Sequence, residues 1–217
     1  MHMMLGNKYI RVRFGGGYPT EHIIRFMARN YYSLERTRVK VLDFGCGAGA
    51  HTWYLAREGF DTYAFDISET AVKRLRNRLE TEGLRANVIA ADGMNMPYED
   101  EFFDVIIDNV SILTNRISDI KIMYNGVYSK LKTSGKFITV VFGKETTGYG
   151  TGKEIEPGTY EGIEKGCLQR IGCRHFFEET ELKEILQKIG FRNISVEFIF
   201  YSDRGNIVNQ LVAVAEK

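Results

Sequence analysis

Three glycines at alternate positions follow a short apolar run in "VLDFGCGAGAHT", residues 41–52. Asp43 lies inside this run, and Gly45, Gly47 and Gly49 come directly after it. Glycine is unfavourable in ordered structure unless the backbone needs a positive φ or another group approaches it closely. The spacing therefore predicts a loop at the end of a strand, with a ligand lying against it.

Two further acids end neighbouring strand-like segments. Asp66 ends "DTYAFD" and Asp92 ends "NVIAAD". In open α/β sheets the ligand binds beyond the carboxyl ends of the strands, near the point where the strand order reverses. An acid after the second strand can accept hydrogen bonds from both hydroxyls of a ribose. The pattern thus favours a ligand that contains a nucleoside.

Two classes of nucleoside ligand fit this arrangement. Gly45, Gly47 and Ala50 satisfy the dinucleotide fingerprint, and Asp66 follows about 20 residues later, as that fingerprint expects. Taken alone, the fingerprint is compatible with NAD and a dehydrogenase. Asp43, however, occupies a position that is usually apolar in dinucleotide folds, because a buried acid there needs a polar partner.

The elements that must position these residues alternate between strands and helices. Periodicity predicts strands over 39–44, 61–66, 87–92, 103–110 and 136–143, and helices over 18–32, 50–58, 69–82 and 120–131. Pro19 suits the first turn of the first helix, and Ser68 is a candidate N-cap. After a helix around "ELKEILQKIG", the segments "NISVEFIFYS" and "NIVNQLVAVAE" predict an antiparallel hairpin. Such alternation predicts a doubly wound, mostly parallel sheet.

With these motifs the chain resembles the class I S-adenosylmethionine-dependent methyltransferases. The resemblance lies in "VLDFGCGAG", "AFDIS", "AADGMNMP" and "FDVIIDNVSIL". It covers residues 39–143 well and 176–217 in general pattern. It implies a Rossmann-like α/β fold with a seven-stranded sheet that ends in the C-terminal antiparallel hairpin, and it favours S-adenosylmethionine over NAD.

The resemblance also implies roles for individual residues, with S-adenosylmethionine as cofactor and S-adenosylhomocysteine as product. Asp43 helps to place the methionine amino group and Asp66 holds the ribose hydroxyls. Residues after the third and fourth strands flank the adenine and the methionyl part. The cofactor-binding residues expected on this basis are Asp43, Gly45, Cys46, Gly47, Gly49, Asp66, Ile67, Asp92, Gly93, Met94 and Asn109.

The expected activity is methyl transfer to an oxygen or nitrogen atom of a small-molecule acceptor, a metabolite, sugar or phosphorylated intermediate. Two other classes remain open: a non-catalytic S-adenosylmethionine-binding module or partner subunit, and an NAD-dependent oxidoreductase. "DNVS", residues 108–111, differs from the N/D-P-P-Y/F motif typical of base-modifying amino-methyltransferases. This difference disfavours a nucleic-acid acceptor.

Two segments fall outside the resemblance and are expected to select the acceptor. We expect one domain over 1–217, with an N-terminal helical segment over 1–36 and a lid-like insertion over 144–175 that lacks clear internal structure. Tyr149, Glu156 and Tyr160 in the insertion, and Tyr18 opposite, are candidates to line an acceptor pocket. Equally, these aromatic rings can fill packing gaps.

Among four histidines, His175 is the candidate general base because it closes the irregular insertion. The alternative is a hydrogen-bonded loop histidine. Cys167, Cys173 and His175 match no standard zinc spacing and lack a fourth ligand, so no metal site is expected.

The composition is that of an ordinary globular chain, with 44% hydrophobic and 26% charged residues. A net charge of +1 supplies no electrostatic attraction to nucleic acid or to an anionic membrane. Three cysteines cannot all pair within one chain, which agrees with a reducing compartment. With no apolar run long enough to span a membrane and no secretory signal pattern, we expect a cytoplasmic protein.

Overall fold

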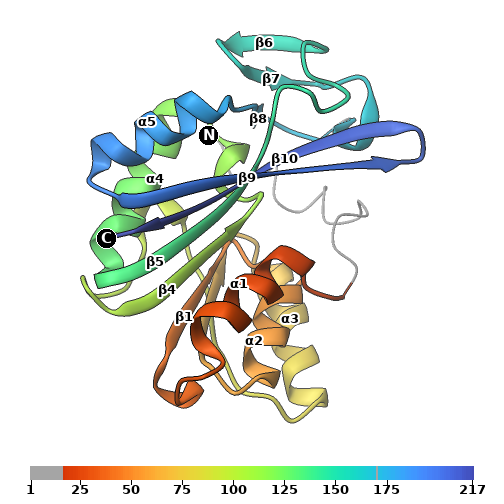
Figure 1. Ribbon diagram of the computed structural model, residues 1–217. Coiled ribbons are helices and arrows are strands. Elements are labelled where there is room, and N and C mark those ends of the chain that lie inside the picture. Colours follow the sequence, from red (N-terminus) through yellow and green to blue (C-terminus); the bar gives the residue numbers. More distant parts are fainter. Residues whose placement is uncertain (1–16, 170) are drawn as a thin grey trace. The chain divides into compact units, whose positions relative to one another are not determined.

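A computed structural model describes residues 17–169 and 171–217. It shows a seven-stranded sheet with the strand order β3-β2-β1-β4-β5-β10-β9 and a separate three-stranded sheet with the order β6-β7-β8 (Figure 1). The strands are β1 Lys40–Phe44, β2 Asp61–Asp66, β3 Asn87–Ala90, β4 Phe103–Asn109, β5 Leu131–Phe142, β6 Lys153–Glu156, β7 Thr159–Glu161, β8 Arg174–His175, β9 Arg192–Asp203 and β10 Asn206–Glu216. The helices are α1 Glu21–Tyr31, α2 Ala50–Arg57, α3 Glu69–Thr81, α4 Ile117–Lys130 and α5 Glu179–Ile189. The predicted fold class is confirmed.

Two compact units divide the described chain. The first contains the residues up to Ile107 together with 129–136, and the second contains 108–128 and 137–217. Strands β4 and β5 contribute residues to both units.

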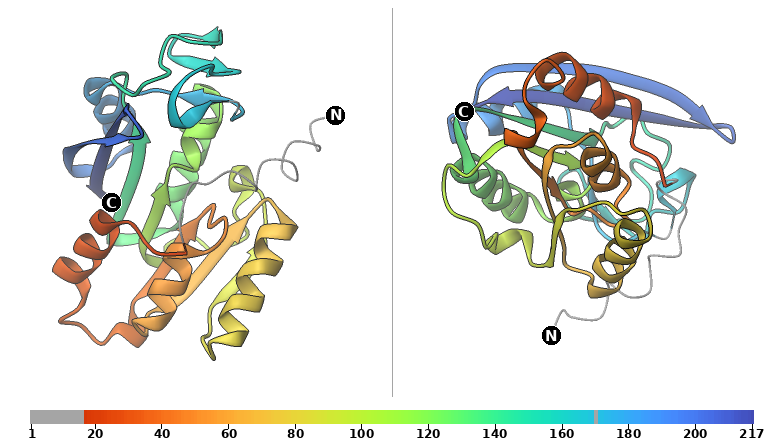
Figure 2. Two further views of the ribbon diagram at one scale, coloured as in Figure 1. Left: turned by 90° about the vertical axis from the view of Figure 1, so that its right-hand side faces the viewer. Right: turned by 90° about the horizontal axis from the view of Figure 1, so that it is seen from below.

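In the first unit, β1, β2 and β3 pair in parallel, with Asp43 opposite Ala64 and Asp66 opposite Ala90. Helices α2 and α3 lie side by side (Figures 1 and 2). Ser68 caps α3, its side chain accepting a hydrogen bond from the Ala71 amide, as its sequence position predicts. The parallel register brings the residues that follow each strand to one edge of the sheet.

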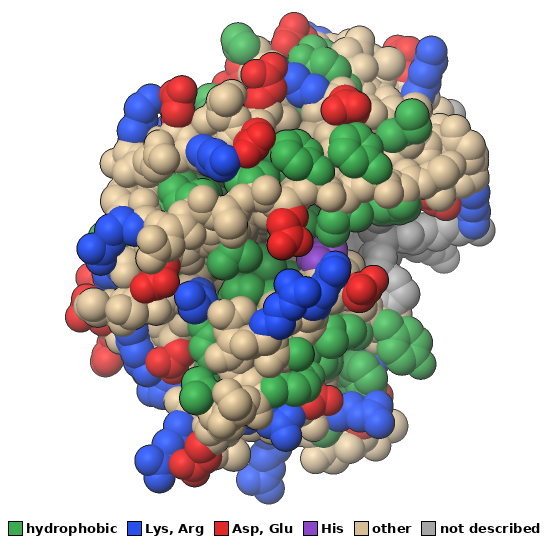
Figure 3. All heavy atoms as spheres, in the orientation of Figure 1, with side chains coloured by type: hydrophobic (Ala, Val, Ile, Leu, Met, Phe, Trp, Pro, Cys, Tyr) green, Lys and Arg blue, Asp and Glu red, His purple; other side chains and the backbone are tan. Residues whose placement is uncertain are grey.

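In the second unit, β9 and β10 form the predicted antiparallel hairpin. Helix α5 ends at Gly190, whose φ of 118° suits a glycine cap. The hairpin exposes Phe198, Phe200, Tyr201 and Ile207, each with more than two fifths of its surface in solvent. On the face drawn in Figure 3, basic and acidic side chains are interspersed.

Some local predictions were wrong. Residues 144–175 do not lack internal structure: β6 and β7 form a hairpin, and β8 pairs with β7. The β6–β7 hairpin forms at the sequence "EPGT", because Pro157 and a Gly158 with a φ of 79° suit a tight turn of type II. Helix α1 begins after Thr20, so Pro19 lies outside it, and Leu131 begins β5 rather than ending α4. Residues 1–16 of the predicted N-terminal segment lie outside the described residues.

None of the helices in the described part of the chain has the length and hydropathy needed to cross a bilayer.

Candidate functional site

The loop between β1 and α2 uses its three glycines in different ways. Gly45, Gly47 and Gly49 have φ values of 63°, 52° and 81°, which L-residues with a side chain adopt at a cost. A Cβ on Gly49 would lie 2.1 Å from Leu75 Cδ1, so this glycine permits close packing of the loop on α3. A Cβ on Gly47 would meet no heavy atom within 4 Å. Gly47 is therefore the position where the loop backbone is open to a ligand.

Asp66 is tied to this loop through both carboxylate oxygens. The Gly47 amide donates to Oδ2 and the Ser68 amide donates to Oδ1, each over 2.8 Å. A carboxylate oxygen has more than one acceptor site, so both oxygens keep capacity for further donors. The carboxylate is thus held beside the open side of the loop and can accept a pair of hydroxyl groups.

Asp43 is a buried acid, and one of its two carboxylate oxygens accepts hydrogen bonds. The Thr52 amide and hydroxyl both donate to Oδ2, over 2.9 and 2.5 Å. Among the described residues, no donor contacts Oδ1. Burial, together with the nearby charge of Asp66, raises the pKa of Asp43 to about 7, although the two Thr52 bonds act in the opposite direction. The carboxyl is therefore poised for a cationic or hydrogen-bonding partner.

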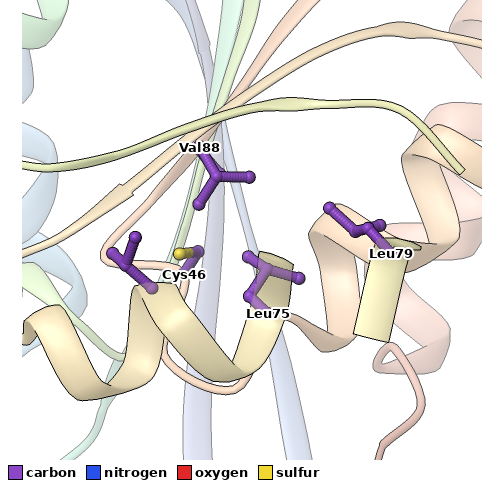
Figure 4. Close-up of a cluster of buried hydrophobic side chains, with 6 residues drawn as sticks. Cys46, Leu75, Leu79 and Val88 are labelled. Carbon is purple, nitrogen blue, oxygen red and sulfur yellow. The ribbon is translucent and has the colours of Figure 1, made fainter. Parts of the chain in front are cut away.

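Cys46 faces away from the open side of the loop. Its side chain packs in a buried cluster with Leu75, Leu79 and Val88 (Figure 4), together with Ala64 and Val72. Its amide donates to the Phe65 carbonyl over 2.9 Å. Burial, with Asp43 and Asp66 nearby, raises the pKa of the thiol well above its usual range. Its side chain contributes packing, so any contact with a cofactor falls to the backbone.

The turn after β3 brings a polar and an apolar group to the same edge of the sheet. Asp92 Oδ1 accepts from the Met94 amide over 2.9 Å and caps the short 3-10 helix Gly93–Asn95. A Cβ on Gly93 would lie 2.4 Å from Phe44 Cζ. Next to this turn, Ile67 is 70% exposed and Met94 is 37% exposed. Two exposed apolar side chains flanking Asp66 and Asp92 suit the faces of a planar ring.

The N-terminal segment is fastened to the helix that follows the loop. The Thr20 amide donates to His51 Nε2 over 3.3 Å, so His51 carries its proton on Nδ1. Burial lowers the pKa of His51 to about 4, which keeps the ring neutral. Tyr18, a predicted acceptor residue, is 74% exposed and its ring contacts Trp53 edge-on at 5.8 Å.

The end of β4 belongs to the second unit and contains an acid that the sequence analysis did not single out. Asp108 is fully buried and accepts from the amides of Ser111 and Ile112 and from the Thr139 hydroxyl. Val110 has a φ of 57°, a strained value for a β-branched residue. Asp108 thus fixes the turn that presents Asn109, whose role at a cofactor stays a prediction.

Tyr149 and Tyr160, two of the predicted acceptor residues, lie together. Their ring centroids are 5.5 Å apart, and Phe176 lies 5.4 Å from the first and 6.1 Å from the second. Glu156 lies elsewhere: it accepts from the Ile117 amide over 2.6 Å and from the Thr159 hydroxyl over 3.0 Å. The tyrosines therefore share a cluster, while Glu156 anchors the start of α4.

His175, the predicted general base, is buried with both ring nitrogens occupied. Nδ1 lies 2.7 Å from Thr159 Oγ1, and Nε2 lies 3.2 Å from Glu181 Oε1. The ring contacts Phe177 edge-on at 4.5 Å. These contacts correspond to the alternative reading of His175 as a hydrogen-bonded histidine that holds the sheet to α5.

Comparison with known proteins gives one family match. Residues 41–135 match the family described as "Methyltransferase domain". A human protein, mitochondrial arginine-hydroxylase NDUFAF5, is 30% identical over 181 residues, which are 83% of this chain and 50% of that protein. The chain spans about half the length, or less, of the curated relatives it matches.

Solved structures share the fold. A crystal structure of an S-adenosylmethionine-dependent methyltransferase from Methanosarcina mazei superposes with a TM-score of 0.73 at 20% identity, covering 92% of this chain and 98% of that one. Phosphoethanolamine N-methyltransferase 2 of Haemonchus contortus, in complex with S-adenosylmethionine, superposes with a TM-score of 0.67 at 17% identity. That match covers 90% of this chain and 52% of the other.

Proposed function

We propose that the chain is a class I S-adenosylmethionine-dependent methyltransferase, since residues 41–135 match a methyltransferase domain family and a solved methyltransferase shares its fold. In this proposal it binds S-adenosylmethionine at the glycine loop and methylates a small molecule. The acceptor atom is an oxygen or a nitrogen, and the product is S-adenosylhomocysteine. One observation carries the proposal: the open backbone of Gly47 lies within a hydrogen bond of the Asp66 carboxylate. A ligand bound against this loop would therefore lie beside a carboxylate that can accept hydrogen bonds from the ribose hydroxyls.

In this proposal different residues at this edge of the sheet bind the ribose, the adenine and the methionyl part of the ligand. Asp66 accepts the two ribose hydroxyls through oxygens already oriented by Gly47 and Ser68. Ile67 and Met94 cover the adenine faces, which would remove their exposed apolar surface from water. Asp43 orients the amino group of the methionyl part, directly or through a water molecule. Its Oδ1 is available for this because, among the described residues, both donors to the carboxylate bond to Oδ2.

Methyl transfer from a sulfonium is an in-line displacement whose leaving group departs neutral, so no protein acid has to protonate it. The protein's main task is to hold the acceptor atom in line, and well-oriented intramolecular reactions gain up to about 7 to 11 kcal/mol in this way. A neutral amine attacks without a base, whereas a hydroxyl must lose a proton. With both ring nitrogens of His175 hydrogen-bonded, no step is assigned to it.

Charge and sequence support a small acceptor. The net charge is +1, and acidic and basic side chains are interspersed on the face shown in Figure 3. The turn after β4 reads "DNVS" and lacks the motif of base-modifying amino-methyltransferases. These features favour a metabolite over a nucleic acid.

The first experiment is parallel calorimetric titration with S-adenosylmethionine, S-adenosylhomocysteine and NADH. We expect micromolar binding of the first two ligands and none of NADH. Binding of NADH alone would contradict the proposal and favour an oxidoreductase. Binding of none of the three would remove the cofactor assignment.

The second experiment tests turnover with S-adenosylmethionine labelled in its methyl group and a panel of amines, alcohols and phenols. We expect label in at least one acceptor. The relative named as an arginine hydroxylase shows why turnover needs its own test. Tight cofactor binding with no labelled product from any acceptor would favour a non-catalytic module or a partner subunit.

A further inference from the structure

Strand β9 is the last strand of the seven-stranded sheet and carries exposed apolar side chains. Phe198 and Phe200 alternate along β9, so they project to the same face. Ile207 of β10 lies on that face too, because it pairs with Ser202, whose side chain points the same way. The three apolar residues are each about half exposed, at 49%, 52% and 53%. A contiguous apolar surface of this kind is typical of an interaction site.

The outer edge of β9 presents a row of main-chain groups for hydrogen bonding. Among the residues that the structure describes, β9 pairs with β10 alone. Arg204 and Gly205 have φ values of 50° and 80°, which suit a two-residue hairpin turn whose flanking residues, Asp203 and Asn206, are a hydrogen-bonded pair. Such pairs alternate with non-hydrogen-bonded pairs along an antiparallel ladder. The even-numbered residues 196–202 therefore direct their N–H and C=O groups away from β10.

The sequence of β9 does not protect this edge. Natural sheets block exposed edges with lysine, proline, bulges or a covering segment. "NISVEFIFYS", residues 193–202, contains neither lysine nor proline, and Glu197 is its only charged residue. The register with β10 is regular from Ser195 to Asp203, so no bulge interrupts this stretch. A regular, apolar edge of this kind is a template for another strand.

A second copy of β9 satisfies the geometry of this edge. When two identical strands pair antiparallel, outward-pointing groups must meet outward-pointing groups, which requires the two-fold axis to pass through a residue rather than between two residues. Centres near either end of β9 shorten the pairing. A centre on Glu197 places that acid opposite itself, and a centre on Phe200 places it opposite Asp203, so like charges disfavour both. Phe198 and Ile199 remain as centres.

A centre on Ile199 gives the more favourable cross-strand pairs. Phe198 then lies opposite Phe200 of the second copy, and the symmetry repeats this aromatic pair. Glu197 lies opposite Tyr201 of the second copy, whose hydroxyl can donate to the carboxylate. A centre on Phe198 instead places Glu197 opposite Ile199. The strand is thus complementary to itself in one register.

The exposed area also fits a dimer. An aromatic side chain buries about 150 to 250 Å², and Phe198, Phe200 and Tyr201 are each about half exposed. Two copies therefore offer roughly 600 Å² of aromatic surface, about half of what a small specific interface buries in total. Ile207 and the main chain of β9 supply further area. A total at the lower end of the range predicts a dimer that dissociates on dilution.

We propose that two copies of this chain form a homodimer by antiparallel pairing of β9 about Ile199, which joins their sheets edge to edge. Every residue in this interface belongs to the second unit. The inference concerns assembly and does not depend on the proposed function.

The first test is the oligomeric state of the full chain, measured by sedimentation velocity through the micromolar concentration range. We expect a reversible equilibrium between one and two chains. Two-fold edge pairing closes at two copies, so a larger assembly would contradict it. A monomer at every concentration would overturn the proposal. Dimers that form only after removal of residues 1–16 would assign the edge to a segment of the same chain and would also overturn it.

Phe200→Lys tests the aromatic pairs. It removes a ring and adds charge at the interface, so we expect the dimer to dissociate roughly tenfold more readily or more, as for an aromatic anchor. Ile122→Lys is the matched control, because Ile122 is 49% exposed on α4 of the same unit and lies outside β9. Circular dichroism checks that both variants fold. A folded Phe200→Lys protein that dimerises like wild type would contradict the interface.

Intermolecular disulfides test the register. Ile199 lies opposite its own copy in a non-hydrogen-bonded pair, where Cα atoms are about 4.5 Å apart, within reach of a disulfide. We expect Ile199→Cys, with Cys167 and Cys173 replaced by serine, to form a covalent dimer on mild oxidation. Ser195→Cys in the same background is the control, because Ser195 lies opposite Asp203 of the second copy and far from its own counterpart. Cross-linking at Ser195→Cys but not at Ile199→Cys would overturn the proposed pairing.

Discussion

The Gly47 amide donates to Asp66 Oδ2 over 2.8 Å, which ties the loop after β1 to the end of β2 before any ligand is bound. The two residues are far apart in sequence and become neighbours because β1 and β2 pair in parallel. This bond makes the glycine loop and the acid one preorganised unit. An interaction that is already in place need not be ordered when a ligand binds.

Replacing Asp66 tests that unit. Asp66→Ala should weaken S-adenosylmethionine binding by roughly 1.5 to 3 kcal/mol, the range for hydrogen bonds to a charged group. Calorimetric titration measures the change. Asp61→Ala is the matched control, because Asp61 begins the same strand at the opposite edge. Equal losses in the two variants would show that Asp66 has no special role.

Gly47→Ala and Gly49→Ala should differ in kind. Both residues have positive φ, at a cost of about 1 to 2 kcal/mol for an L-residue. Gly49→Ala adds a clash with Leu75 and should lower the Tm further. Gly47→Ala meets open space, so it should fold better than Gly49→Ala yet lose S-adenosylmethionine binding. Thermal unfolding and titration of both variants check this, and a Gly47→Ala protein with wild-type affinity would contradict the site.

Asp43 predicts how cofactor affinity changes with pH. Because its pKa is about 7 in the folded protein, the carboxyl is charged above that pH and neutral below it. A charged carboxylate accepts more strongly from an ammonium group, so affinity should rise between pH 6 and pH 8. Titration of wild type and Asp43→Asn over this range isolates the effect, since the ligand's own ionisation is common to both. Parallel pH profiles would exclude the role.

Thr52 should support Asp43 through its hydroxyl. Thr52→Val keeps the amide bond to Asp43 but removes the 2.5 Å hydroxyl donor within a fully buried site. Loss of a donor to a buried acceptor costs about 1 to 3 kcal/mol. We expect a lower free energy of unfolding in urea for Thr52→Val and a near-wild-type value for Thr52→Ser, which keeps the hydroxyl. A stable Thr52→Val protein would contradict this account.

His51 should make the protein sensitive to acid. Its folded pKa of about 4 lies below the ordinary value of 6.5, so the unfolded chain binds the proton first. The stability that His51 contributes is complete above about pH 6.5 and falls as the pH approaches 4, by up to roughly 3 kcal/mol. The difference in Tm between wild type and His51→Gln should therefore shrink from pH 7.5 to pH 5. A difference in Tm that stays constant over this pH range would contradict the account.

The sequence alone determined the elements whose signals are local. Alternating apolar runs predicted the strands of the large sheet to within a few residues, and Ser68 was recognisable as an N-cap because its acceptor role depends only on the next few amides. The alternation of strands and helices predicted the fold class. The glycine and acid motifs predicted the ligand-binding edge, because parallel strands bring their carboxyl ends to one edge of the sheet. The turn "EPGT" also carried a local signal, which the length of the insertion outweighed.

Only the tertiary structure decided what each side chain does. Gly47 and Gly49 look equivalent in the sequence. An added Cβ would meet no heavy atom within 4 Å at Gly47, but it would clash with Leu75 at Gly49. His175 read as a base and is held between Thr159 and Glu181. Asp108 was not singled out from the sequence, yet it fixes the turn after β4 through three hydrogen bonds. Partners, burial and desolvation come from residues distant in the chain, and no local pattern contains them.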